Sequence, residues 1–264
     1  MNQSAPFSQR SVIVTGAGKG IGKATALAFA EAGADVVVAA RTQSDIEDLA
    51  KQIKAMGRRA LAVRCDVAVE AQVEAMMGRT IKEFGKVDVL VNNAGGAGKA
   101  RNHVADVDMD QFNQVVGVNL NGTMHCSKHA LKDMLARQSG VIVNISSTAG
   151  RTGLVGMSSY VAAKWGVIGL TQCMALEVAK QGVRVNCVVP GYTLTEALEA
   201  RLHAIAAEQD ISYEESVARA AALSPQNRIA TAREVADVIV FLASDAAVSI
   251  HGQTINANAA LCMN

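Results

Sequence analysis

The sequence predicts an α/β protein in which a doubly wound parallel sheet is covered by helices on both faces. Short runs rich in Val, Ile and Ala alternate with longer amphipathic stretches along most of the 264 residues, a pattern typical of parallel strands joined by crossover helices. Apolar residues make up 50% of the chain and aromatic residues 3%, which suits helices packed closely on a sheet. Only three prolines occur and no linker interrupts the pattern, so we expect residues 1–264 to form a single Rossmann-type domain.

Each predicted strand is a short apolar or β-branched run. The seven runs are Ser11–Thr15, Asp35–Ala40, Arg59–Cys65, Val87–Asn92, Gly140–Ile145, Val183–Val188 and Gln253–Asn256. The stretches between the first four predict helices at Gly22–Ala32, Ser44–Met56 and Val69–Phe84.

Local signals set the expected helix ends. Ser44, with Glu47 three residues later, is predicted to form a capping box. Gly33 and Gly57 lie where helices are expected to stop. Asp108, with acidic residues two positions to either side, is expected to mark a helix start before Gln111.

Two segments depart from the alternating pattern. Residues 1–9 are expected to be a loose N-terminal tail. Residues 194–228 are rich in Ala and Glu and predict one or two helices inserted between the sixth and seventh strands. Because ligands of an open parallel sheet bind beyond the carboxyl ends of its strands, this insertion is a candidate lid over a substrate.

Composition argues against several classes of partner and location. The net charge is +1, so we expect neither nucleic-acid nor membrane binding. No apolar run approaches the ~18 residues of a membrane span, and the first residues lack the apolar segment of a signal peptide. The five cysteines are widely spaced and indicate reduced thiols of a cytoplasmic protein.

A glycine-rich segment follows the first predicted strand and runs into a helix. It reads T-G-A-G-K-G-I-G from Thr15 to Gly22. Gly16, Gly20 and Gly22 allow a tight turn and close approach of the backbone to a pyrophosphate at a helix N-terminus. The alternative is a plain glycine-rich turn, but the strand before it and the helix after it favour phosphate binding.

The end of the second predicted strand indicates which dinucleotide binds. A carboxylate there would grip a ribose 2′-hydroxyl, but the chain has Ala40 followed by Arg41. An arginine suits a 2′-phosphate, and Lys19 in the glycine loop is a second candidate cation. We therefore expect NADP(H) rather than NAD(H), the alternative being two solvated surface cations.

Tyr160 and Lys164 lie four residues apart in a predicted helix, on one face. A phenol has a pKa of about 10, so a tyrosine that works near pH 7 needs a pKa about three pH units lower, or ~4 kcal/mol in favour of the phenolate. We expect the ammonium of Lys164 to supply this. Ser147, thirteen residues earlier, would hold a carbonyl oxygen beside the phenol.

The order of these motifs resembles the short-chain dehydrogenase/reductase family. The matching segments are TGAGKGIG (15–22), CDV (65–67), NNAG (92–95), VNLNG (118–122), NISS (144–147), YVAAK (160–164) and PGYTLT (190–195). Together they extend over nearly the whole chain, and seven ordered matches are specific for the family but not for a substrate.

The resemblance implies a role for each matching residue. Tyr160 would exchange a proton with the substrate oxygen, Ser147 would orient that oxygen, and Lys164 would lower the tyrosine pKa and hold the nicotinamide ribose. Asn119 would position a water that links Lys164 to solvent. These four are the implied catalytic set. Tyr160 and Lys164 are also implied to contact the cofactor, together with Gly16, Lys19, Gly20, Ile21, Gly22, Arg41, Asp66, Val67, Asn93, Ala94, Gly95, Pro190, Gly191, Thr193 and Thr195.

The expected function is NADP(H)-dependent interconversion of a ketone or aldehyde and a secondary alcohol. Alternatives are a 3-oxoacyl-thioester reductase, a sugar or steroid alcohol dehydrogenase and, from another class, a non-catalytic cofactor-binding scaffold. The acidic insertion argues against a carrier-protein partner, and the complete catalytic set argues against the scaffold. The sequence names neither the substrate nor its stereochemistry nor the physiological direction.

Other candidate features are weaker. His125 and His129 could in principle ligate a metal, but no third ligand is evident and we expect none. The loop Lys99–His103 could reach a substrate or simply be solvated. The resemblance implies a homo-oligomer, a tetramer or dimer, packed through Gln111–Leu135 and Ser159–Lys180. Ala259 and Ala260 fall where the family leads one to expect glycines, with a consequence the sequence does not define.

Overall fold

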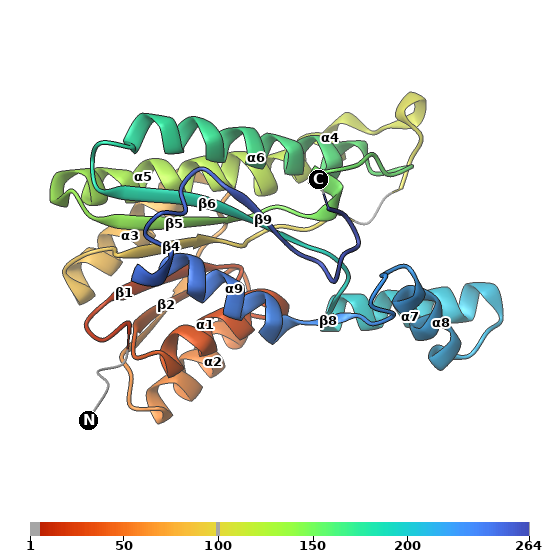
Figure 1. Ribbon diagram of the computed structural model, residues 1–264, viewed down its shortest axis with the longest axis horizontal. Helices are drawn as coiled ribbons and strands as arrows, with labels where there is room; N and C mark the ends of the chain where they lie inside the picture. Colours follow the sequence, from red (N-terminus) through yellow and green to blue (C-terminus); the bar gives the residue numbers. More distant parts are fainter. Residues whose placement is uncertain (1–5, 99–100, 264) are drawn as a thin grey trace.

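The computed structural model describes residues 6–98 and 101–263. Its central sheet has seven strands, all parallel, in the order β3-β2-β1-β4-β5-β6-β9 (Figure 1). The strands are β1 (Ser11–Thr15), β2 (Asp35–Ala40), β3 (Ala60–Arg64), β4 (Val89–Asn92), β5 (Gly140–Ile145), β6 (Val183–Pro190) and β9 (Thr254–Ala257). Each predicted strand is present, with ends shifted by two residues at most. The strand order reverses between β1 and β4, which is where ligands bind in open α/β sheets.

Helices cover both faces of this sheet, which confirms the predicted single-domain α/β fold (Figure 1). One face carries α1 (Gly20–Glu31), α2 (Gln43–Ala55) and α9 (Ala232–Ala243); the other carries α3 (Glu70–Phe84), α5 (Gly122–Arg137) and α6 (Ser158–Val178). Successive strand residues point to opposite faces. Val12 and Val14 therefore join the first core and Ile13 the second, which explains why the strands are apolar throughout.

The helix ends agree only in part with the prediction. Gly33 and Gly57 follow α1 and α2 with φ of +98° and +77°, and Asp108 caps α4 (Met109–Val116) by accepting from the amides of Asp110 and Gln111. The predicted capping box at Ser44 is wrong. Helix α2 begins one residue earlier, at Gln43, so Ser44 lies inside its first turn.

The prediction of a loose tail over residues 1–9 is wrong for the part that the structure describes. Phe7 is fully buried, and its ring meets that of Phe29 edge-on at 5.0 Å between centroids. Its amide donates to the carbonyl of Ala32. Burial of one aromatic side chain contributes ~2 kcal/mol, enough to hold the segment, but a lone aromatic among polar residues gives no periodic signal. Residues 1–5 lie outside the described part.

The insertion at 194–228 forms two helices, α7 (Glu196–Gln209) and α8 (Tyr213–Ala222), around a small apolar cluster. They extend beyond one end of the sheet (Figure 1). A two-stranded parallel sheet of β7 (Thr193–Leu194) and β8 (Ala230–Thr231) closes the base of the insertion. The sequence did not predict this small sheet, because a two-residue strand is too short to show alternation.

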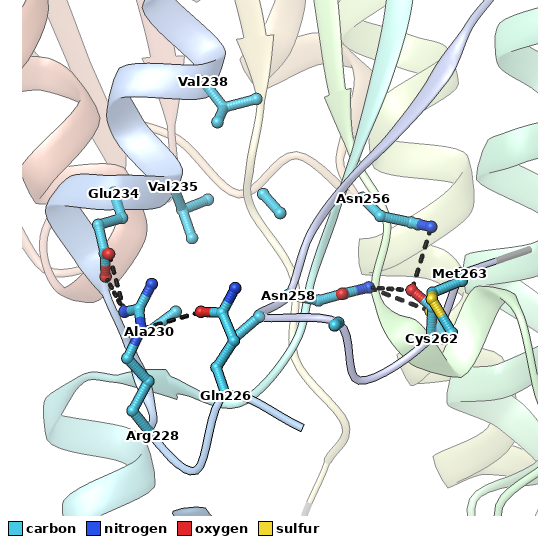
Figure 2. A pocket seen from close by; sticks show the side chains of 13 residues that line it. Gln226, Arg228, Ala230, Glu234, Val235, Val238, Asn256, Asn258, Cys262 and Met263 are labelled. Carbon is cyan, nitrogen blue, oxygen red and sulfur yellow. Dashed lines mark hydrogen bonds and ion pairs between the residues drawn. The ribbon is translucent and has the colours of Figure 1, made fainter. Parts of the chain in front are cut away.

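The C-terminal segment folds back after β9. Ala259 and Ala260 adopt the left-handed conformation, with φ of +52° and +66°. Asn256 and Asn258 donate to the Cys262 carbonyl, closing the turn beside a hollow of about 440 Å³ (Figure 2). Asn258 also packs so closely behind Gly191 that a β-carbon on Gly191 would lie 2.9 Å from its Cβ. The segment therefore supports the loop after β6.

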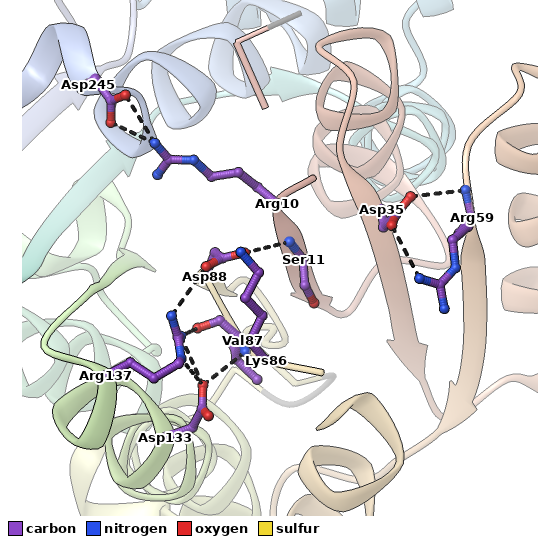
Figure 3. A network of polar contacts seen from close by, with 10 residues as sticks. All are labelled: Arg10, Ser11, Asp35, Arg59, Lys86, Val87, Asp88, Asp133, Arg137 and Asp245. Atoms are coloured by element: carbon purple, nitrogen blue, oxygen red, sulfur yellow. Dashed lines mark hydrogen bonds and ion pairs between the residues drawn. The ribbon is translucent and has the colours of Figure 1, made fainter. Parts of the chain in front are cut away.

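The amino-terminal end of the sheet carries a network of ion pairs (Figure 3). Asp88, only 8% exposed, pairs with Lys86 at 3.0 Å and Arg137 at 3.4 Å and accepts from the amide of Ser11 at 2.9 Å. Arg137 also pairs with Asp133. This network ties the starts of β1 and β4 to α5. Among the described residues, no helix is long and apolar enough to span a membrane.

Candidate active site

The glycine loop between β1 and α1 is a backbone cradle. Gly16 has φ of +64°, and a β-carbon on Gly22 would collide with the Gly16 carbonyl, so these two positions require glycine. Asn93 braces the loop from the next strand by donating to the carbonyls of Thr15 at 2.9 Å and Gly16 at 3.2 Å. The hydroxyl of Thr15 accepts from the amides of Asn93 and Ala94.

The cradle already binds an oxyanion, because the Gly20 amide donates to the carboxylate of Glu196 at 3.1 Å. Gly20 is the first residue of α1, where free amides and the helix dipole favour negative charge. Glu196 thus stands where a phosphate oxygen would bind. The geometry fits the pyrophosphate of a dinucleotide. The sequence identified Glu196 only as part of an acidic insertion.

A hollow of about 200 Å³ adjoins the cradle on the side of β2, and Arg41, Asp66, Val67 and Ala94 line it. This is the predicted adenosine side. Lys19 faces the same hollow but pairs with Asp45 at 3.7 Å, so part of its charge is offset.

A neighbouring hollow of about 420 Å³ brings three guanidinium-bearing side chains to this rim. Arg41 follows β2, Arg64 ends β3 and Arg79 comes from α3. All three are exposed. Asp66 lines the same hollow, so three cations face one carboxylate there, and the excess of positive charge favours an anionic group.

Ser147, Tyr160 and Lys164 converge on one cavity of about 750 Å³. Ser147 follows β5, while Tyr160 and Lys164 occupy the first turns of α6. Lys164 is 4% exposed, and its ammonium lies 5.5 Å from the Tyr160 ring centroid and donates to the Ile145 carbonyl at 2.9 Å. Ser146 joins the segment after β5 to α6, because its hydroxyl donates to the Lys164 carbonyl. The three predicted residues therefore share a wall of the cavity.

The predicted depression of the tyrosine pKa is wrong for this chain. Burial raises the pKa of Tyr160, and the hydrogen bond with Ser147 opposes this only in part. Burial also lowers the pKa of Lys164 to about 8. Attraction between the ammonium and the phenolate would lower the tyrosine pKa, but taking both charges out of water costs more than this attraction supplies. The phenol is therefore held in its protonated form at neutral pH.

Asn119 lies behind Gly95, in a π-helical turn, η2 (Gly117–Asn121), between α4 and α5. Its side chain donates to the carbonyls of Gly96 at 2.9 Å and Val115 at 2.8 Å and accepts from the Gly96 amide. A β-carbon on Gly95 would meet both the Asn119 amide and the Lys164 amine. Asn119 thus fixes the floor of the cavity next to Lys164.

The structure gathers the remaining predicted residues around these centres. The predicted cofactor residues that line the large cavity besides Tyr160 and Lys164 are Gly16, Lys19, Gly20, Ile21, Gly22, Asn93, Gly95, Pro190, Gly191, Thr193 and Thr195. Arg101 also lines it. This residue belongs to the loop Lys99–His103, for which both a substrate contact and a solvated position were considered; Lys99 lies outside the described residues. Tyr192, in the loop between β6 and β7, and Arg201, on α7, line it as well. Both were missed, because the sequence alone does not show which side chains of a loop or an inserted helix face the cavity.

The two histidines considered as metal ligands have structural partners. His129 is buried and lies 3.0 Å from the carboxylate of Glu70, and His125 lies 3.0 Å from the Val67 carbonyl. Within residues 6–98 and 101–263 no group of three potential ligands is close enough to hold a metal ion.

Known proteins resemble this chain over nearly its full length. The sequence profile of short chain dehydrogenases matches residues 10–206. A cis-4-hydroxycyclohexanecarboxylate dehydrogenase of Sinomonas cyclohexanicum is 45% identical over 93% of this chain and 94% of its own. A 3-oxoacyl-[acyl-carrier-protein] reductase of Staphylococcus aureus is 36% identical over 96% and 98%.

A solved structure agrees with this relationship. The actinorhodin polyketide ketoreductase, crystallised with NADPH, superposes with a TM-score of 0.91 at 34% identity over 97% of this chain and 98% of its own. The chain therefore belongs to the short-chain dehydrogenase family, whose members are oxidoreductases that act on alcohols and ketones with a nicotinamide cofactor.

Proposed function

We propose that this protein is an NADP(H)-dependent oxidoreductase that interconverts a ketone or aldehyde and a secondary alcohol, with Tyr160 as the acid and base. One observation carries the proposal. Ser147, Tyr160 and Lys164 line the same cavity as the glycine cradle that binds an oxyanion at Gly20. A carbonyl group beside Tyr160 would therefore lie within the space that also admits a dinucleotide.

The dinucleotide would be held by the glycine loop, by the Asn93–Gly95 turn and by the Pro190–Thr195 segment, and it supplies the hydride. Ser147 and Tyr160 then hold the substrate oxygen by two hydroxyl groups. Because burial keeps the Tyr160 phenol protonated, it is ready to donate its proton to an oxygen that gains charge. This favours ketone reduction at neutral pH and alcohol oxidation at higher pH.

The choice of NADP(H) rests on the arginines around the adenosine side. Arg41, Arg64 and Arg79 surround one hollow, and a 2′-phosphate carries a charge that such a cluster binds well. Comparison of KM for NADPH and NADH tests this. We expect the native chain to favour NADPH and Arg41→Asp to reverse the preference. An equal or lower KM for NADH in the native chain would overturn it.

Reduction of a 3-oxoacyl thioester is the second candidate, because one of the relatives is named as a reductase of such thioesters. A carrier-protein partner is acidic and would need a basic entrance. The exposed surface of the α7–α8 insertion instead carries six acidic side chains, Glu196, Glu199, Glu208, Asp210, Glu214 and Glu215. A free ketone is therefore favoured over a thioester on a carrier protein.

Tyr160→Phe tests the mechanism directly. The variant keeps the ring and loses only the hydroxyl, so we expect NADPH binding to persist, measured by nicotinamide fluorescence. Turnover should fall by at least 10²-fold, as expected for loss of a general acid. The substrate for this test is found by assaying the native chain on a panel of ketones with NADPH and of alcohols with NADP⁺. Undiminished turnover in this variant would refute Tyr160 as the acid.

Assembly, lid closure and location extend this proposal. Trp165 and Leu176 on α6 and Met124 on α5 are exposed, at 52%, 81% and 44%, and suit a contact with a second copy in a dimer or tetramer. Light scattering measures that state.

Helices α7 and α8 would serve as the lid over the substrate. All five cysteines are free thiols in the structure, in keeping with a cytoplasmic location.

A further inference from the structure

The large cavity has an uneven distribution of charge. Among the described residues that line it, four carry a positive charge and one a negative charge. Glu196, the acidic one, already accepts the Gly20 amide. Lys19 is paired with Asp45, and Lys164 is buried and donates to a carbonyl. The remaining two cations are Arg101 and Arg201.

Neither arginine has an acidic partner within residues 6–98 and 101–263. The ion pairs among these residues all involve other side chains. Arg101 comes from the loop after β4, and its backbone packs against Gly156 in the segment that leads to Tyr160. Arg201 lies on α7, with its guanidinium 6.0 Å from the ring centroid of Tyr192. Two separate elements thus direct a cation to the cavity that holds the reactive phenol.

Apart from these arginines, Lys19, Lys164 and Glu196, the described residues that line the cavity are uncharged. Ala97, Ile145, Tyr192 and Leu198 line the cavity, and Leu198 is buried on the same helix as Arg201. Both arginines are exposed, and a guanidinium at the edge of an apolar site binds a carboxylate well because it can form two parallel hydrogen bonds with it. The cavity therefore suits a molecule with an apolar body, a carbonyl at one end and an anion at the other.

We propose that the substrate is a keto acid, or the corresponding hydroxy acid, whose carboxylate is bound by Arg101 and Arg201 while its carbonyl meets Ser147 and Tyr160. This inference rests on the proposed function and adds the chemical class of the substrate. It assigns specificity to two side chains outside the predicted catalytic set. The carboxylate takes no part in the proton transfer.

The test compares acids with their own neutral methyl esters. The probes are straight-chain oxo acids with two to five carbons between carbonyl and carboxylate, and 3- and 4-oxocyclohexanecarboxylate, each paired with its methyl ester. NADPH consumption gives kcat/KM for both members of every pair. We expect at least one acid to exceed its ester by tenfold or more. If no acid exceeds its ester while neutral ketones are reduced, the inference fails and the proposed function stands. If no ketone of any kind is reduced with either cofactor, the proposed function itself fails.

Variants then connect this preference to the arginines. Arg101→Met and Arg201→Met keep an unbranched aliphatic stem and remove the charged guanidinium. We expect at least one of them to lower the ratio of acid to ester by about tenfold or more, the value of one good charge-assisted contact, through a higher KM for the acid. Arg219→Met is the matched control, because Arg219 also lies on the insertion but pairs with Glu215 away from the cavity. It should leave the ratio unchanged.

A separate measurement excludes a role in cofactor binding. Titration of NADPH by fluorescence gives its Kd in each variant without any substrate. We expect Arg101→Met and Arg201→Met to leave this Kd within about twofold. A tenfold weaker Kd with an unchanged ratio of acid to ester would show that the arginines hold the dinucleotide phosphates, and would overturn the inference. An unchanged ratio and an unchanged Kd would show solvated surface arginines, which overturns it equally.

Discussion

The charged side chains at the two ends of the parallel sheet are in opposite situations. At the amino-terminal end, Asp88 is buried and meets Lys86, Arg137 and the Ser11 amide (Figure 3). At the carboxyl-terminal end, Arg101 and Arg201 line a cavity with no acidic partner in the described part of the chain. Buried charge is tolerated in a protein when it is paired. The buried, paired charges at the first end therefore support the fold, whereas the two arginines at the second end are exposed to solvent and leave their charge available to the proposed ligand.

The largest expected effect separates these two ends by stability. Asp88→Ala leaves Lys86 and the Ser11 amide without their acceptor and removes one of the two carboxylates that Arg137 meets, so we expect a loss of about 3 kcal/mol in the free energy of unfolding. Arg201→Met should change it by less than about 0.5 kcal/mol. Urea denaturation followed by circular dichroism measures both. Equal losses in the two variants would contradict the distinction between the two ends.

Lys164 lies at the carboxyl-terminal end of the sheet and is buried with its charge, so it should cost stability. Its pKa is lowered from 10.5 to about 8 by burial. The folded chain therefore holds this proton less tightly than the unfolded chain does. The stability that the group contributes is fully present above pH 10.5 and is lost as the pH falls toward 8.

Lys164→Met removes this titration and provides the measurement. Relative to the variant, the native chain should gain up to about 3 kcal/mol in unfolding free energy as the pH rises from 8 to 10.5. The comparison between the two chains cancels the titration of other groups, such as the buried thiols. Urea denaturation at several pH values gives both curves. Parallel curves would show that Lys164 is not desolvated. Turnover should be lost at every pH, because the wall beside Tyr160 changes.

The features that the sequence could predict are those fixed by backbone geometry. Gly22 is required by its contact with the Gly16 carbonyl, and the strands are fixed by burial on two faces, so both leave a readable pattern. The predicted lowering of the Tyr160 pKa was wrong, because the burial of this side chain depends on all of the packing around α6. Phe7 and Arg201 depend on one side chain meeting a distant element, and a single residue of that kind carries no periodic signal. The sequence could therefore predict residues that gather around one cavity, but it could not predict the electrostatics of that cavity.

A smaller effect concerns the carboxylate at the cradle. Glu196 accepts the Gly20 amide at 3.1 Å, so an incoming phosphate must displace it against like charge. We expect Glu196→Ala to bind NADPH about two- to fivefold more tightly, since a carboxylate at a helix N-terminus is worth ~0.3–1 kcal/mol. Fluorescence titration measures the Kd. Glu199→Ala is the control, because Glu199 is exposed on the same helix and should leave the Kd unchanged. Weaker binding in Glu196→Ala would mean that Glu196 helps to hold the cofactor.

The smallest expected effect lies in the C-terminal turn that supports the loop after β6. Ala260 has φ of +66°, a conformation that costs an L-residue roughly 1–2 kcal/mol. Glycine adopts it freely but loses more entropy on folding, so we expect Ala260→Gly to raise the unfolding free energy by about 0.5–1 kcal/mol. Ala207→Gly, at an exposed position in α7, should instead lower it by about 1 kcal/mol. Thermal denaturation of the two variants gives the sign of each change. A loss of stability in Ala260→Gly would mean that contacts of the alanine methyl group outweigh the backbone strain, and that the turn depends on alanine for packing rather than tolerating it.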